Sequence, residues 1–219
     1  MPDTAGQGLC HQDSDPHAGI RLVAGLGNPG REYDGTRHNI GFAVADRLAS
    51  LLGASFAKQS KWDALVAKAT DDDLSLLKPT TFMNLSGEAV ADYARFYRIP
   101  AASTLIVLDD VALPLGTLRF RREGGSGGQK GLGSVLMHFA TESVPRLRVG
   151  VGGSPHGGGD LSGHVLSRFA PEEQQSADEA ISRAAEAVLC AVRRGIETAM
   201  NLYNATPNIQ QRDNTANQP

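Results

Sequence analysis

Apolar residues recur along this chain in two alternating patterns, which predict strands and helices in turn. Short continuous apolar runs are typical of buried strands, whereas apolar residues that return every three to four positions indicate amphipathic helices. The predicted strands span residues 21–25, 63–68, 74–78, 104–109, 116–122 and 146–152. The predicted helices span residues 39–52, 86–97, 132–140 and 171–203. This alternation favours a single α/β domain, with a twisted, mixed and mostly parallel sheet flanked by helices.

Local signals refine this pattern. The run TLIVLD at 104–109 is the most hydrophobic of the chain and predicts a central strand, whereas 116–122 is typical of an edge strand. Ser86 is a plausible N-cap of its helix. No proline interrupts the chain after Pro171 and before residue 203, so one continuous helix is expected there. We expect the folded domain to span residues 20–204, between a disordered leader (1–19) and a disordered polar tail (205–219).

Composition narrows the class of protein. Hydrophobic residues make up 41% and charged residues 21%, which is ordinary for a soluble globular protein. The two cysteines are far apart and the start lacks the features of a signal peptide, so a reducing, cytoplasmic setting is expected. No apolar run approaches the length that a membrane helix needs, so no membrane span is expected. The net charge is −3, and Asp3, Asp13 and Asp15 of the leader account for it. A strongly basic nucleic-acid binder is therefore not indicated, although RFRR at 119–122 is a local basic patch.

The stretch GLGNPG at residues 25–30 spells the GxGxxG pattern of dinucleotide-binding loops. Such a loop must open directly into a helix whose N-terminus meets the pyrophosphate, and an acidic residue must end a second strand about twenty residues later. Here no helical pattern starts before about residue 38, and Asp46 lies within a helix. The sequence therefore argues against a nicotinamide cofactor, and no cofactor is expected.

Several polar residues could instead form a catalytic site. His38 precedes a helix, where the helix dipole favours the neutral imidazole that a general base needs, although an isolated His more often caps or packs. Asp109 ends the most hydrophobic strand and could orient such a His or cap the following turn, with Asp110 as the neighbouring alternative. Asn28 lies between glycines and offers both donors and an acceptor.

Two further features leave alternatives open. Asn84, in FMNLSG, could be a helix cap or a site residue. The glycine loop at 124–131 carries Gln129 and Lys130, and could approach a polyanion, cover a cleft or serve as a surface linker. No Cys, Ser or metal-binding pattern is persuasive, and His156 and His164 are expected in solvated loops. The available chemistry is a His base acting on water, with an Asp to orient it and Asn donors to polarise a carbonyl.

Five stretches, in this order, resemble the bacterial peptidyl-tRNA hydrolase family: GLGNPGREYDGTRHNIGF, KPTTFMNLSG, VLDDVALPLG, GGSGGQKGLGS and RLRVGVGGSP. The resemblance covers about residues 21–203, and the ordered set is far more specific than any single piece. It implies a monomeric, cytoplasmic α/β domain whose substrate is peptidyl-tRNA. The family cleaves the ester between the peptide and the tRNA 3′ end, and so recycles tRNA from stalled ribosomes.

The resemblance also implies roles for individual residues. His38 would activate water, Asp109 would stabilise His38, and Asn28 would help to select substrates with a blocked amino group. The residues implied in contacting the substrate end or tRNA phosphates are Tyr33, Phe82, Asn84, Lys130, Arg121 and Arg148.

The chain departs from the family pattern at two places. Where family members commonly have HDELDLP, this chain has LDDVALP at residues 108–114, and it keeps the aligned Asp109. Where the glycine loop of family members usually ends in HNG, this chain has Gln129-Lys130-Gly131. Lysine donates but cannot accept, so a phosphate contact by Lys130 would make binding more sensitive to salt. The family also includes plant organellar relatives that serve in intron splicing. The alternative function is therefore an RNA-binding protein that does not hydrolyse its ligand.

Overall fold

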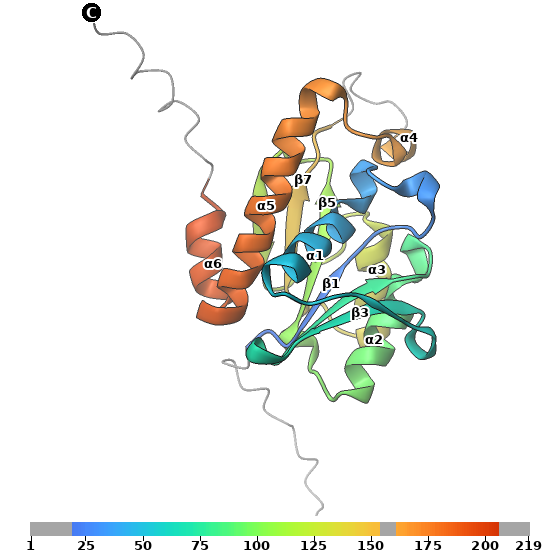
Figure 1. The fold of residues 1–219 in the computed structure, drawn as a ribbon, viewed down its shortest axis with the longest axis vertical. Helices are drawn as coiled ribbons and strands as arrows, with labels where there is room; N and C mark the ends of the chain where they lie inside the picture. The colour runs from blue at the N-terminus through green and yellow to red at the C-terminus, as the bar shows by residue number, and fades with distance from the viewer. Residues whose placement is uncertain (1–18, 154–160, 206–219) are drawn as a thin grey trace, which may run out of the picture.

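The computed structural model describes residues 19–153 and 161–205, which form a seven-stranded sheet between two layers of helices (Figure 1). The strand order is β2-β3-β4-β1-β5-β7-β6. The strands are β1 (Leu22–Gly25), β2 (Ala57–Gln59), β3 (Ala64–Ala69), β4 (Leu74–Pro79), β5 (Thr104–Asp110), β6 (Leu118–Arg121) and β7 (Arg146–Gly150). The four central strands β4, β1, β5 and β7 are parallel, and β2, β3 and β6 extend the sheet with antiparallel pairings. The predicted mixed sheet flanked by helices is confirmed, with its parallel pairings confined to the centre.

Alternate residues of the central strands face two separate cores, because successive side chains of a strand point to opposite faces. Val23 of β1 and Val107 of β5 join one core, whereas Leu22 and Ile106 join the other. The first core packs under α1, α5 and α6, and the second under α2 and α3. The helices are α1 (Ile40–Leu51), α2 (Ser86–Phe96), α3 (Lys130–Phe139), α4 (Leu161–Leu166), α5 (Pro171–Arg194) and α6 (Ile196–Tyr203).

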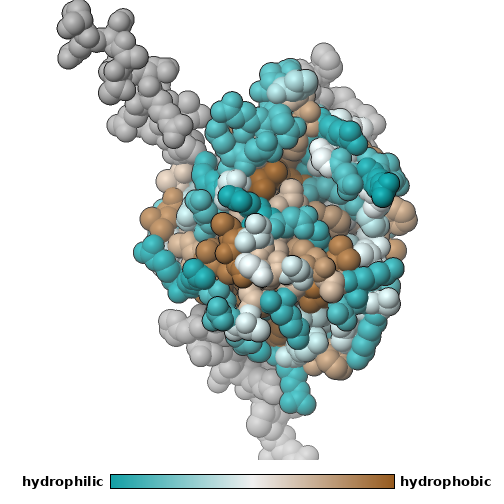
Figure 2. Space-filling view, in the orientation of Figure 1, coloured by the Kyte–Doolittle hydropathy of each residue, from teal (hydrophilic) through white to brown (hydrophobic). Residues whose placement is uncertain are grey.

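The face that carries α1 and α5 is seen in Figure 2. Hydrophilic side chains cover most of this face, and hydrophobic ones show mainly near its middle. Within the two described ranges, none of the helices combines the length and apolar content needed to cross a bilayer. Most of the leader and tail that the sequence predicts to be disordered lies outside the described residues.

The glycines of GLGNPG let α1 approach β1 closely. A Cβ added to Gly25 would lie 2.2 Å from the carbonyl oxygen of Gly41 in α1, and one added to Gly27 would lie 2.8 Å from the Phe42 ring. Gly30 has φ of 115°, which non-glycine residues rarely adopt. After this loop come two 3₁₀ turns, η1 (Arg31–Tyr33) and η2 (Arg37–Asn39), before α1 begins. The glycines therefore serve packing and turning, as the absence of an immediate helix indicated.

Three sequence expectations are wrong in detail. The helix expected over 171–203 breaks at Gly195, whose φ of 87° is unfavourable for other residues. Ser86 does not cap α2: the 3₁₀ turn η5 (Met83–Leu85) comes first, and Ser86 is the buried first helical residue. His164 lies on α4 rather than in a loop, with its Nε2 2.9 Å from the carbonyl oxygen of Gly152. The short strand β2 and the helix α4 were not predicted, and His156 lies outside the described residues.

Candidate active site

The side chains that the sequence singled out converge at the carboxyl edge of the central strands. Asn28 follows β1, Asp109 is the second-to-last residue of β5, and His38 lies on η2. All three line one cavity of about 610 Å³. The carboxyl ends of parallel strands open at the same edge of a sheet, where α/β folds commonly place their ligands. This topology brings residues that are distant in sequence into one site.

His38 and Asp109 form the central pair of this cavity. Nδ1 of His38 lies 2.9 Å from Oδ2 of Asp109, and the Asp109 side chain is only 3% exposed. The N–H direction is not yet aligned for a hydrogen bond, which is common in catalytic sites before substrate binds. With Nδ1 facing the carboxylate, the neutral ring presents Nε2 as its proton acceptor. The pair therefore has the arrangement of a base and its orienting carboxylate.

Gln129 holds the second oxygen of Asp109. Its Nε2 donates to Oδ1 of Asp109 at 3.0 Å, and its Oε1 accepts from the backbone N–H of Leu132 at 2.7 Å. The second bond caps α3, so one side chain joins the start of that helix to the His–Asp pair. Sequence analysis did not assign Gln129 to the site. The sequence carried no clear signal for this cap, because the helical pattern was predicted to begin only at residue 132 and glutamine is not a preferred N-cap residue.

Asn39 fixes the loop that carries Asn28. Its Oδ1 accepts from the backbone N–H of Asn28 at 2.8 Å, and its Nδ2 donates to the backbone carbonyl of Asn28 at 2.9 Å. The Oδ1 of Asn28 accepts from the backbone N–H of Met83 at 2.8 Å. No hydrogen bond engages Nδ2 of Asn28 within the described part of the chain, so this group is an available donor. Asn39 is a second site residue that sequence analysis missed, because its helical position masked its role.

The remaining predicted contacts divide into two groups. Phe82, Asn84, Lys130 and Arg148 line the cavity together with the central pair. Phe82 is 56% exposed and lines the cavity, so it offers apolar surface to a ligand there. Asn84 lies within η5 and does not cap α2.

Tyr33 and Arg121 stand apart. Tyr33 lies on η1 and Arg121 on β6, and neither belongs to the described residues that line the cavity. The structure therefore gives no cavity contact to these two predicted residues.

Arg148 is tied to Asp110, the neighbour of Asp109. Its Nε lies 2.6 Å from Oδ2 of Asp110, while Oδ1 of Asp110 accepts from the backbone N–H of Ala112. Asp110 is therefore engaged with Arg148 and the following turn, and Asp109 is the carboxylate that faces His38. Within residues 19–153 and 161–205, no three His, Cys, Asp or Glu side chains are grouped so that they could hold a metal ion.

An α/β sheet with a paired His and Asp in a cavity at its carboxyl edge defines the class of α/β enzymes that use a general base. A family model described as peptidyl-tRNA hydrolase matches residues 22–212. The chain belongs to the peptidyl-tRNA hydrolase family.

Individual relatives agree with this assignment. The peptidyl-tRNA hydrolase of Caldanaerobacter subterraneus subsp. tengcongensis is 47% identical over 185 residues, which cover 84% of this chain and 98% of the relative. That of Akkermansia muciniphila is 42% identical over 190 residues, with 87% and 98% covered. The crystal structure of peptidyl-tRNA hydrolase from Acinetobacter baumannii superposes with a TM-score of 0.80 at 35% identity, over 86% of this chain and 96% of that one.

Proposed function

We propose that this protein hydrolyses the ester between the peptide and the tRNA in peptidyl-tRNA released from stalled ribosomes. The observation that carries the mechanism is the 2.9 Å contact between His38 and Asp109, in the cavity that Asn28 also lines. Family membership supports the reaction. We further propose that the protein acts as a cytoplasmic monomer.

In this mechanism His38 acts as the general base. Its Nε2 takes a proton from a water molecule while the water oxygen attacks the ester carbonyl carbon. When the tetrahedral intermediate collapses, the bond to the tRNA 3′ oxygen breaks and that oxygen receives the proton from His38. The products are a peptide with a free carboxyl group and a tRNA with a free 3′ hydroxyl. Asp109 orients the ring and stabilises the transient imidazolium.

The remaining residues, five of them in the cavity and Tyr33 and Arg121 outside it, bind and select the substrate. The available Nδ2 of Asn28 donates to a carbonyl of the peptide, which favours a blocked amino group over the free ammonium of aminoacyl-tRNA. Phe82 and Asn84 contact the substrate end, as does Tyr33 from the adjacent 3₁₀ turn. The tRNA phosphates are contacted by Lys130, Arg148 and Arg121.

The substitution His38→Ala tests the mechanism. We expect it to nearly abolish release of the acyl group from N-acetyl-aminoacyl-tRNA, while tRNA binding persists. His138→Ala is a matched control, because His138 contacts the carbonyl of Ser134 within α3 rather than Asp109. Full activity of the His38 variant would refute the mechanism.

The alternative, RNA binding without turnover, predicts no hydrolysis by the wild-type protein. A single-turnover assay on N-acetyl-aminoacyl-tRNA separates the two functions. The close pairing of His38 with Asp109 favours turnover, because RNA binding alone has no need of an oriented base.

A further inference from the structure

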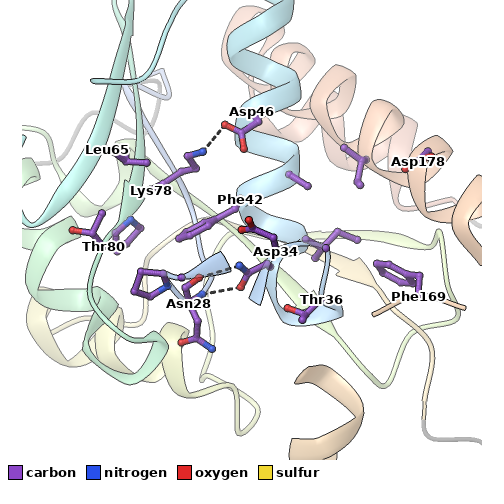
Figure 3. A pocket seen from close by; sticks show the side chains of 18 of the residues that line it. Asn28, Asp34, Thr36, Phe42, Asp46, Leu65, Lys78, Thr80, Phe169 and Asp178 are labelled. Atoms are coloured by element: carbon purple, nitrogen blue, oxygen red, sulfur yellow. Dashed lines mark hydrogen bonds and ion pairs between the residues drawn. The ribbon is translucent and has the colours of Figure 1, made fainter. Parts of the chain in front are cut away.

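A second cavity, of about 480 Å³, adjoins the active-site cavity. Asn28 lines both, so the Asn28 loop forms the wall between them. The second cavity lies among α1, β4 and the first half of α5 (Figure 3). In Figure 3 the side-chain amide of Asn28 points away from Lys78 and Asp46, and two dashed lines tie the backbone of Asn28 to a neighbouring side chain, that of Asn39. This wall is therefore well anchored, with its amide group directed away from the second cavity.

The lining of the second cavity combines apolar surface with an excess of negative charge. Its charged side chains are three carboxylates, of Asp34, Asp46 and Asp178, and one ammonium group, of Lys78. Lys78 is already paired, with its Nζ 2.5 Å from Oδ1 of Asp46. Within the described part of the chain, neither Asp34 nor Asp178 forms an ion pair. The larger apolar lining residues include Pro29, Ile40, Phe42, Leu65, Phe169 and Ile181.

This lining suits a ligand group with an aliphatic stem and a positive end. Lysine and arginine side chains lay their methylene groups along apolar surface while the charged end stays at the rim. The carboxylates of Asp34 and Asp178, which form no ion pair among the described residues, are both on exposed residues, which places compensating charge within reach of such an end. Asp178 also accepts a hydrogen bond from Nε2 of Gln174 at 3.1 Å, which leaves its negative charge in place. An acidic or purely apolar ligand would leave that charge uncompensated.

The order of strands indicates which part of the substrate reaches this cavity. Arg148 and Arg121, proposed here to contact tRNA, lie on β7 and β6, to one side of β1 and β5. The second cavity lies on the other side, against β4 and β3, where Lys78 and Leu65 line it. In peptidyl-tRNA the tRNA and the peptide leave the ester in opposite directions. A substrate with its ester at His38 and its tRNA toward β7 and β6 directs its peptide toward β4.

We propose that the second cavity binds a basic side chain, Lys or Arg, of the peptide upstream of the ester. The inference rests on the proposed function and extends it, since it assigns this enzyme a preference within the peptide. Substrates with a single acylated residue are too short to use the cavity. The preference therefore begins only when the peptide is long enough to pass the wall at Asn28.

The test compares acetylated peptidyl-tRNAs that carry either lysine or its uncharged counterpart norleucine at the second, third or fourth residue from the ester. We expect kcat/KM to favour lysine by about two- to fivefold at one or more of these positions, as one partly exposed ion pair would produce. High salt should weaken the preference. The double variant Asp34→Asn/Asp178→Asn should abolish it, while the control Asp71→Asn, an exposed carboxylate on the β3–β4 turn, should keep it.

The outcomes separate the two proposals. Equal rates for lysine and norleucine at every position, or a preference that survives in the double variant, would overturn the second site. All variants should hydrolyse N-acetyl-aminoacyl-tRNA as the wild type does, because this substrate does not reach the second cavity. Failure of the wild-type protein to hydrolyse even that substrate would overturn the proposed function itself. A melting temperature equal to that of the wild type shows that the double variant is folded.

Discussion

The substitution Asp109→Asn tests most directly how His38 is held. It keeps the size of the side chain, but replaces two accepting oxygens by one oxygen and one NH₂ group. Both oxygens of Asp109 are used, one facing Nδ1 of His38 at 2.9 Å and the other accepting from Gln129 at 3.0 Å. Gln129 cannot turn its own oxygen toward the new amide, because that oxygen caps α3 through Leu132. The asparagine therefore satisfies only one of its two neighbours.

Either orientation of the asparagine harms catalysis. If its oxygen faces Gln129, its NH₂ donates to Nδ1 of His38 and forces the tautomer whose Nε2 carries a hydrogen and cannot accept a proton from water. If its oxygen faces His38, two NH₂ groups meet in a site where residue 109 is 4% exposed. A wrong tautomer lowers kcat by about 10²- to 10⁴-fold in comparable sites, which corresponds to about 3–5 kcal/mol. We expect a loss in this range.

Single-turnover release of the acyl group from N-acetyl-aminoacyl-tRNA measures this loss, and tRNA binding and the melting temperature should change little. The double variant Asp109→Asn/Gln129→Ala removes the donor that competes for the asparagine oxygen. It should recover part of kcat, by about tenfold, because the oxygen is free to face His38. A single variant within about threefold of the wild type, or a double variant no faster than the single one, would refute the reasoning.

Three other substitutions test separate parts of the structure. Glu173→Gln removes the carboxylate that accepts from Arg37 at 2.5 Å, and should lower the free energy of unfolding by about 2 kcal/mol at neutral pH. That bond lowers the pKa of Glu173 below its usual 4.5, so the loss of stability in the variant should vanish as pH falls through the lowered pKa. Denaturant titrations that give the same difference in unfolding free energy at pH 7 and below pH 4 would contradict this. Lys130→Ala should raise KM without changing kcat, and should reduce the salt dependence of tRNA binding by about one counterion. An unchanged salt dependence would show that Lys130 does not contact a phosphate. Gly25→Ala places a Cβ 2.2 Å from the carbonyl oxygen of Gly41 and should destabilise the fold by about 3 kcal/mol, measured by thermal unfolding. A melting temperature equal to that of the wild type would show instead that α1 shifts away from the added methyl group.

Local pattern in the sequence was enough for most of the elements. The run at 104–109 is continuous and β-branched because both of its faces are buried, and it forms the fully buried strand β5. The sequence also predicted correctly that no helix begins directly after GLGNPG, because the residues that follow lack helical periodicity. The sequence did not predict the helix break at Gly195, because the apolar stripe continues across it and a single positive φ does not change the hydrophobic periodicity. The prediction of Ser86 as an N-cap was wrong, because the preceding 3₁₀ turn makes Ser86 the first residue of the helix itself.

The sequence by itself determined which chemistry was available: a histidine before a helix, an aspartate at the end of a buried strand and an asparagine between glycines. Only the tertiary structure decided how these groups meet. The 2.9 Å contact of His38 with Asp109, the bridge from Gln129 to α3 and the pairing of Arg148 with Asp110 all join segments that are distant along the chain. Periodicity reports only which face of an element is buried. The distances between side chains on different elements are set by strand order and by the close packing of α1 on β1, which no local pattern contains.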